Sequence, residues 1–96
     1  MLNIVNIAKL IDAAEEAYAA EVEADEYEVQ QSASADVSLE EICERSDIPE
    51  LNRYLEEKGI PFWLLDEPKV NPDKKYRVWI NITKGGEYRW GLTPVR

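Results

Sequence analysis

Hydrophobic residues recur every three to four positions over the first 24 residues, which is the period of an amphipathic α-helix. At about 100° per residue, one face of this helix carries Ile4, Ile7, Ile11, Ala14 and Tyr18, and the far side carries Lys9, Asp12, Glu16 and Glu23. Beyond Ala20 the pattern weakens, because Glu21 and Asp25 rotate back onto the apolar side. The pattern therefore predicts a helix from Leu2 to about Ala24, with its apolar face in the core.

The next 20 residues carry shorter patterns. Apolar and polar side chains alternate over residues 26–31, as in a short edge strand. Residues 32–36 are small and polar, as in a loop. Ser38 and Glu41 then match a capping box, the pair of side chains that satisfies the first free amides of a helix. A helix is therefore predicted from Ser38 to about Arg45.

A second short helix is expected directly afterwards. Pro49 suits its first turn, and Gly59 suits a left-handed residue just past its end. Residues 60–65 form an apolar run of strand length, and residues 66–75, which contain two prolines, are expected to form a loop.

Residues 76–83 and 87–93 predict a β-hairpin, and its register follows from the alternation of side chains. A two-residue loop would place Ile82 across from Arg89 and mix polar with apolar residues on one face. A three-residue loop with Gly86 left-handed instead pairs Ile82 with Tyr88, Ile80 with Trp90 and Val78 with Leu92. We expect the second register, which places Trp79 on the opposite, more polar face.

Together these elements predict an α+β domain in which a long N-terminal helix and two short helices pack on a small antiparallel sheet with a C-terminal β-hairpin. The expected organisation is one domain over residues 1–96, with an acidic, mainly helical part (1–58) and a β-rich part (59–96) that ends in the hairpin. A reducing compartment, the cytoplasm of a cell or of an infected host, is expected because there is one cysteine, no signal-like start and no membrane-length apolar run.

The order of elements resembles that of a winged-helix domain over about residues 4–93. The resemblance is carried by Ser38-Leu-Glu-Glu-Ile-Cys-Glu-Arg-Ser-Asp-Ile-Pro49 and by Tyr54-Leu-Glu-Glu-Lys-Gly-Ile60. Such a family implies DNA binding through the helix at 49–58. That helix departs from the role because it is short and carries three glutamates against Arg53 and Lys58.

Charge is distributed unevenly along the chain. The net charge is −9, and residues 1–58 hold sixteen Asp or Glu against four Lys or Arg, whereas residues 59–96 hold four against seven. Direct binding of nucleic acid is not expected of the chain as a whole, because its net charge repels phosphates. An interaction with a basic protein is expected instead.

Candidate chemistry for catalysis is sparse. The chain has no histidine, and Cys43 occupies a core-like position without an evident activating group. No spacing matches a calcium loop, a P-loop or a dinucleotide fingerprint. We therefore expect no enzyme, no metal site and no cofactor.

The leading hypothesis places an acidic surface of this protein against a basic, nucleic-acid-binding surface of a partner protein. Its carboxylates meet no Lys or Arg in their stretch of chain and are Asp12, Glu15, Glu16, Glu21, Glu23, Asp25, Glu26 and Glu28. Small acidic inhibitors from phages and plasmids, such as anti-CRISPR and anti-restriction proteins, are similar in size and charge. A plain solvated helix face explains the same residues.

An alternative hypothesis is a winged-helix-like regulator or complex subunit that contacts nucleic acid or protein through the hairpin. The residues that would make this contact are Arg77, Trp79, Lys84 and Arg89. An aromatic side chain beside cations can stack on a base. A structural role, in which Trp79 covers the second face of the sheet, is the competing interpretation.

Overall fold

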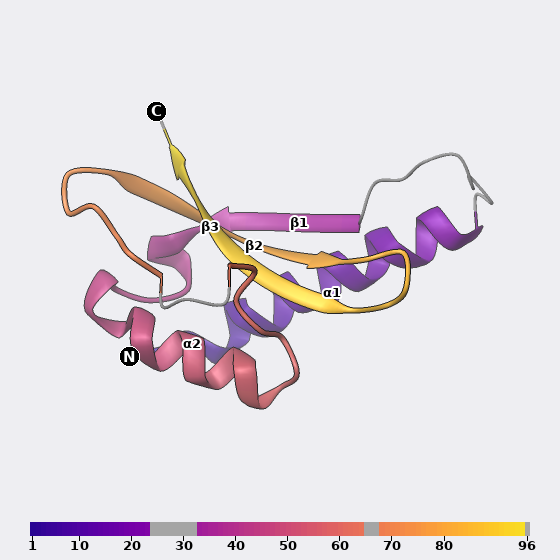
Figure 1. Cartoon of the computed structure of the whole chain (residues 1–96), viewed down its shortest axis with the longest axis horizontal. Helices are drawn as coiled ribbons and strands as arrows, with labels where there is room; N and C mark the ends of the chain where they lie inside the picture. The colour runs from indigo at the N-terminus through magenta and orange to yellow at the C-terminus, as the bar shows by residue number, and fades with distance from the viewer. Residues whose placement is uncertain (24–32, 65–67, 96) are drawn as a thin grey trace.

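The computed structural model describes residues 1–23, 33–64 and 68–95, and these residues form one layer of helices on one layer of sheet (Figure 1). In chain order the elements are α1 (Ile4–Glu23), β1 (Ala33–Ser38), the 3₁₀ turns η1 (Leu39–Glu41) and η2 (Arg45–Asp47), α2 (Ile48–Glu57), β2 (Lys75–Ile82) and β3 (Tyr88–Val95). The strands lie in the order β1-β2-β3, and both pairs are antiparallel. The predicted α+β class, with a long N-terminal helix and a C-terminal hairpin, is confirmed.

Asn3 caps the start of helix α1, because its side-chain oxygen accepts a hydrogen bond from the backbone amide of Asn6 at 3.1 Å. Such a cap satisfies one of the amides left free at a helix start. The helix buries Ile7, Leu10 and Ala14. The prediction that Ile4 faces the core is wrong, since this residue is 48% exposed. The reason is that the buried side of the helix is turned toward Leu10.

Strand β1 occupies residues that the sequence pattern assigned to a loop. Ala33, Ala35 and Val37 alternate with polar residues and pair with Ile82, Ile80 and Val78 of β2, so they lie on the core side. The loop prediction is wrong for residues 33–36, because pairing with β2 makes a strand of these residues despite the weak strand propensity of their small side chains. The strand predicted at 26–31 lies outside the described residues.

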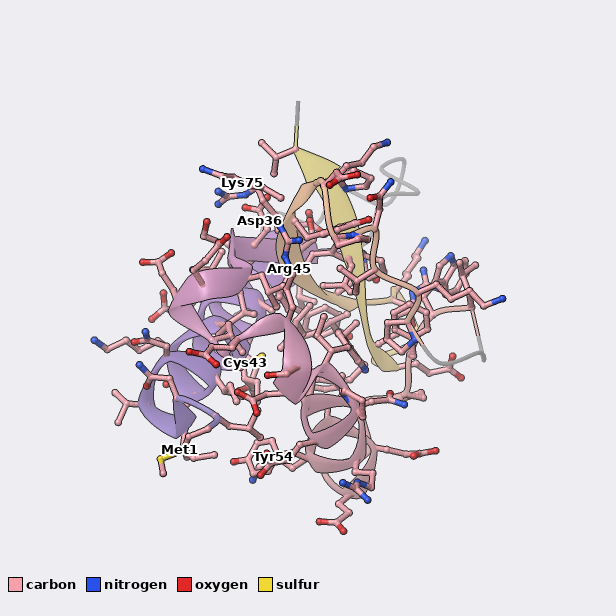
Figure 2. The ribbon with its side chains drawn as sticks, turned by 90° about the vertical axis from the view of Figure 1, so that its left-hand side faces the viewer. Met1, Asp36, Cys43, Arg45, Tyr54 and Lys75 are labelled. Atoms are coloured by element: carbon pink, nitrogen blue, oxygen red, sulfur yellow. The ribbon has the colours of Figure 1, made fainter. Side chains whose placement is uncertain are left out.

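The first of the two predicted short helices is replaced by the 3₁₀ turns η1 and η2. Ser38 makes no side-chain cap, and its hydroxyl instead lies 3.3 Å from a carboxylate oxygen of Glu40. Arg45 of η2 donates hydrogen bonds to the backbone carbonyls of Pro72 and Lys74, which fasten the turn to the segment before β2 at the end of the molecule seen in Figure 2. The helix predicted from Ser38 to Arg45 is therefore wrong, and no pair of α-helices forms a helix–turn–helix here.

Helix α2 begins and ends as its sequence predicts. Pro49 stands in the first turn, and Gly59 has a φ of 82° just past the end. The amide of Gly59 donates to the carbonyl of Glu56, and that of Ile60 donates to the carbonyl of Leu55, which is the Schellman pattern. Leu55 and Ile60, the positions that flank this motif, are both buried in the hydrophobic core.

The hairpin has the predicted three-residue loop. Ile82 pairs with Tyr88, Ile80 with Trp90 and Val78 with Leu92, and Gly86 has a φ of 84°. The apolar run at 60–65 contributes a single parallel bridge between Phe62 and Trp90 among its described residues, rather than a strand. The hydrogen bonds of this bridge join the segment to the free side of β3, through Trp63 N to Trp90 O (2.9 Å) and Trp90 N to Pro61 O (3.1 Å).

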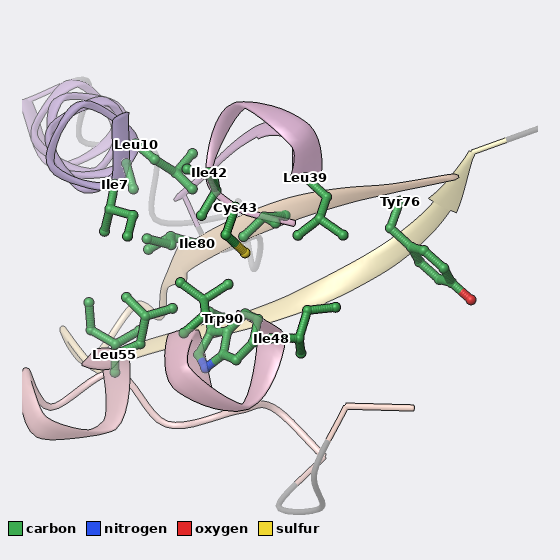
Figure 3. Packing of buried hydrophobic residues seen from close by; sticks show 14 of the residues in the cluster. Ile7, Leu10, Leu39, Ile42, Cys43, Ile48, Leu55, Tyr76, Ile80 and Trp90 are labelled. Atoms are coloured by element: carbon green, nitrogen blue, oxygen red, sulfur yellow. The ribbon is translucent and has the colours of Figure 1, made fainter. Parts of the chain in front are cut away.

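The hydrophobic core lies between the helices and one face of the sheet, which we call the inner face. Figure 3 shows Trp90 and Ile80 of the sheet facing Leu55 and Ile48 of α2, with Ile7 of α1 beside them. Trp90 is fully buried and meets Phe62 edge to face, with ring centroids 5.0 Å apart. Both helices therefore cover the same face of the sheet, and we call the opposite one the outer face.

Candidate functional site

The outer face of the sheet carries a row of residues that crosses all three strands. Asp36 pairs with Trp79, Trp79 pairs with Gly91, and paired residues of antiparallel strands share a face. Trp63 continues the row beyond β3, because Phe62 pairs with Trp90 and the next residue points to the opposite side. We call Asp36, Trp79, Gly91 and Trp63 the aromatic row.

Trp79 lies across the glycine in the middle of this row. A Cβ added to Gly91 would come within 2.2 Å of Cζ2 and 2.6 Å of Cε2 of the indole, so the ring occupies the space that a side chain would fill. Trp79 is half-buried, while Gly91 is buried beneath it. The absence of a side chain at Gly91 therefore lets the indole lie against the sheet rather than extend from it.

Trp63 stands at the far end of the row, where it is 50% exposed. The guanidinium carbon of Arg89 lies 3.7 Å from the centroid of its ring, a cation–π contact. The Nε of Arg89 also donates to Oδ1 of Asn81 at 3.2 Å. These two contacts hold the guanidinium over one face of the Trp63 ring, on the outer face of the sheet.

Arg77 flanks the row on its other side. Its Nε donates to Oδ2 of Asp36 at 2.9 Å, and both side chains remain substantially exposed. The Asp36 carboxylate raises the pKa of Arg77, so the guanidinium stays charged. A shallow, solvent-open depression of about 390 Å³ lies beside this pair and is lined by Ser34, Ala35, Asp36, Trp79 and Asn81.

The structure brings together three of the four hairpin residues that the sequence singled out. Arg77, Trp79 and Arg89 share the outer face, whereas Lys84 lies in the exposed turn beyond the strands. Trp63 also lies on this face, although the sequence did not place it with the hairpin residues. Its signal was the apolar run at 60–65, but only the bridge to β3 determines which of its aromatic residues faces outward.

Of the eight carboxylates of the predicted acidic surface, the structure describes the side chains of Asp12, Glu15, Glu16 and Glu21. Asp12 and Glu16 are exposed, lie one turn apart and point away from the core. Glu21 is exposed on the opposite side of the helix, and Glu15 accepts a hydrogen bond from the Tyr88 hydroxyl at 2.9 Å. Glu23 ends the helix, and Asp25, Glu26 and Glu28 lie outside the described residues.

Charge separates with the layers of the fold. The segments 4–23 and 39–58, which hold the helices and turns, carry twelve Asp or Glu against four Lys or Arg. The segments 33–38 and 68–95, which hold the sheet and its connections, carry three against six. We call the first set the acidic layer. The asymmetry that runs along the sequence is therefore also an asymmetry between two layers in space.

Cys43 is buried, as predicted, in the core beneath η1 (Figure 3). Burial raises the pKa of its thiol to about 11, with a further contribution from the Asp47 carboxylate. The thiol is therefore protonated at neutral pH, and a protonated thiol is a poor nucleophile. Among the residues that the structure describes, no three His, Cys, Asp or Glu side chains cluster as metal ligands would, and no helix is long and apolar enough to cross a membrane.

Comparison with family models, with curated proteins and with solved structures finds no match for this chain.

Proposed function

We propose that this protein is a non-catalytic binding protein whose acidic layer occupies a basic, nucleic-acid-binding surface of another protein, as an inhibitor or adaptor. The observation that supports this proposal is that this layer holds twelve acidic residues but only four basic ones. Asp12 and Glu16 lie at its exposed surface, and no ion pair joins either to a Lys or Arg in the part of the chain that the structure describes.

Spacing and charge together explain why a phosphate-binding surface is the expected partner. Carboxylates four residues apart on a helix are separated by about 6 Å along its axis, similar to successive phosphates of a nucleic-acid strand. Like charges at this spacing destabilise a helix by a few tenths of a kcal/mol. A basic partner would relieve this repulsion, and the favourable long-range field would speed association.

The test uses two double variants with the same change in net charge. Asp12→Lys with Glu16→Lys reverses the exposed pair on α1, and Asp73→Lys with Glu87→Lys reverses two exposed carboxylates outside the acidic layer. Each tagged protein is used for affinity purification from cells of its source organism, and captured proteins are identified by mass spectrometry. Circular dichroism checks that each variant is folded.

The wild type and the Asp73/Glu87 variant are expected to capture the same basic protein, and the Asp12/Glu16 variant is expected to lose it. An excess of duplex DNA is expected to release the captured protein, because both ligands need the same basic surface. Equal capture by the two variants, or capture that DNA does not affect, would contradict the proposal.

A further inference from the structure

The outer face combines aromatic and cationic side chains in an order that the sequence alone does not reveal. The pairing places the row Ser34–Asn81–Arg89 on one side of the aromatic row and the row Ser38–Arg77–Thr93 on its other side. Each side therefore supplies one arginine. Trp79 and Trp63 are separated by two strand spacings, roughly 10 Å.

Both arginines are held in place and still have donors to offer. Among the described residues, Arg89 uses Nε for Asn81, and Arg77 uses Nε and Nη2 for Asp36. A guanidinium has five N–H donors, so several remain for a ligand. A preorganised guanidinium fork suits phosphate oxygens.

The net charge of −9 argues against an anionic ligand only if that charge acts uniformly over the molecule. Its excess lies in the acidic layer, on the other side of the sheet, and packed layers lie roughly 10 Å apart. The Debye length is about 8 Å at 0.15 M salt, so the outer face is partly screened from those carboxylates. The charged strand residues on the outer face are three cations, Lys75, Arg77 and Arg89, and one anion, Asp36.

We propose that the outer face binds single-stranded nucleic acid, with bases stacked on Trp79 and Trp63 and phosphates held by Arg77 and Arg89. Aromatic residues on a sheet stack bases without regard to sequence, and neighbouring arginines follow the backbone. A single strand fits better than a duplex, because its bases are free to stack on this open face. Together with the proposed partner of the acidic layer, this would place a nucleic-acid-binding protein and a single strand on opposite sides of one small adaptor.

The test measures the fluorescence anisotropy of labelled dT10 and U10, titrated with protein at about 0.15 M salt. Trp63→Ala with Arg89→Gln removes the exposed cation–π pair of the outer face. The matched control is Tyr54→Ala with Lys58→Gln, which removes a cation–π pair of the same kind on and just beyond α2, where the ammonium lies 5.0 Å from the ring centroid. Both double variants lose one positive charge.

We expect the Trp63/Arg89 variant to bind at least tenfold more weakly than the wild type, since stacking and an arginine contact are lost together. The Tyr54/Lys58 variant is expected to bind within twofold of the wild type. The slope of log affinity against log salt should be no steeper than about −1.4, because two arginines neutralise at most two phosphates of a single strand.

Three results would overturn the proposal. The first is no binding of either oligonucleotide at 100-fold excess of protein, and the second is an equal loss in both double variants. The third is binding of a labelled ten-residue polyglutamate, used as a probe, without binding of dT10 or U10. That result would assign the outer face to an acidic protein segment. Binding of one oligonucleotide but not the other supports the proposal and identifies the type of strand.

Discussion

Trp90 and Trp79 lie on neighbouring strands of one hairpin but on opposite faces of the sheet. Trp90 is fully buried between the strands and α2, and Phe62 packs against it. Trp79 is half-buried, lies over Gly91 and has arginines in the rows on either side. The same residue type therefore serves the core in one place and an accessible surface in the other.

The difference comes from what packs on each face. Alternation along the strands creates two faces, but it does not determine which is covered. The inner face is apolar and is covered by α1 and α2, whereas none of the helices in the described residues packs on the outer face. An aromatic residue on the outer face is thus available for binding, and the following predictions test this contrast.

The largest effect is expected at Trp90. Trp90→Ala should destabilise the fold by about 3–5 kcal/mol, because it removes a fully buried indole and leaves a cavity. Urea unfolding followed by circular dichroism measures the loss. If the alanine variant does not fold, Trp90→Phe serves instead and should cost less, since it retains a ring and removes a buried N–H that has no acceptor among the described residues.

Trp79→Ala is the matched substitution on the outer face, and it should cost less than half as much as Trp90→Ala. Equal losses at the two positions would mean that the outer face is a second core rather than an accessible surface.

A smaller effect is expected at Gly91. Gly91→Ala introduces a Cβ into the space of the Trp79 indole, so the ring must move outward, at a cost of about 1–2 kcal/mol. The variant is made in a Trp63→Phe background, which leaves Trp79 as the tryptophan outside the core. Acrylamide is then expected to quench the fluorescence of Trp79 more strongly than in the Trp63→Phe protein alone. Gly85→Ala is the control, because a Cβ added there would meet no atom closer than a Thr83 side-chain oxygen at 3.9 Å, apart from the two adjacent residues. Unchanged quenching in Gly91→Ala would show that Trp79 does not depend on the glycine.

The smallest effect is expected where the acidic layer meets the hairpin. The hydrogen bond to Glu15 raises the pKa of the Tyr88 hydroxyl in the folded protein. The bond therefore stabilises the fold fully at any pH below the pKa of tyrosine in the unfolded chain, near 10, and this stabilisation is lost as the pH rises through the raised pKa of the folded protein. Tyr88→Phe should therefore cost less than about 1 kcal/mol at pH 7. Urea unfolding at pH 7 and above pH 10 should show this difference shrinking. Tyr54→Phe is the control, and a difference that does not depend on pH would exclude the Glu15 contact as its cause.

Where local signals were strong, the sequence determined the structure. Local sequence was sufficient to predict three features: helix α1, the cap at Gly59 and the left-handed Gly86. The register of the hairpin was also predictable, because a slip of one residue would turn its apolar side chains outward. Of the residues proposed to bind a ligand, Arg77, Trp79 and Arg89 could be assigned to one face from this register.

Tertiary structure decided the rest. Ala33–Ser38 becomes a strand because β2 offers a partner, and the residues after it turn in 3₁₀ geometry although they carry the letters of a capping box. Trp63 joins the aromatic row because its neighbour Phe62 bridges to Trp90, a residue 28 positions further along the chain that no local pattern could identify. Local periodicity specifies which residues share a face, but contacts between distant segments specify which face is covered and which side chains meet on the other.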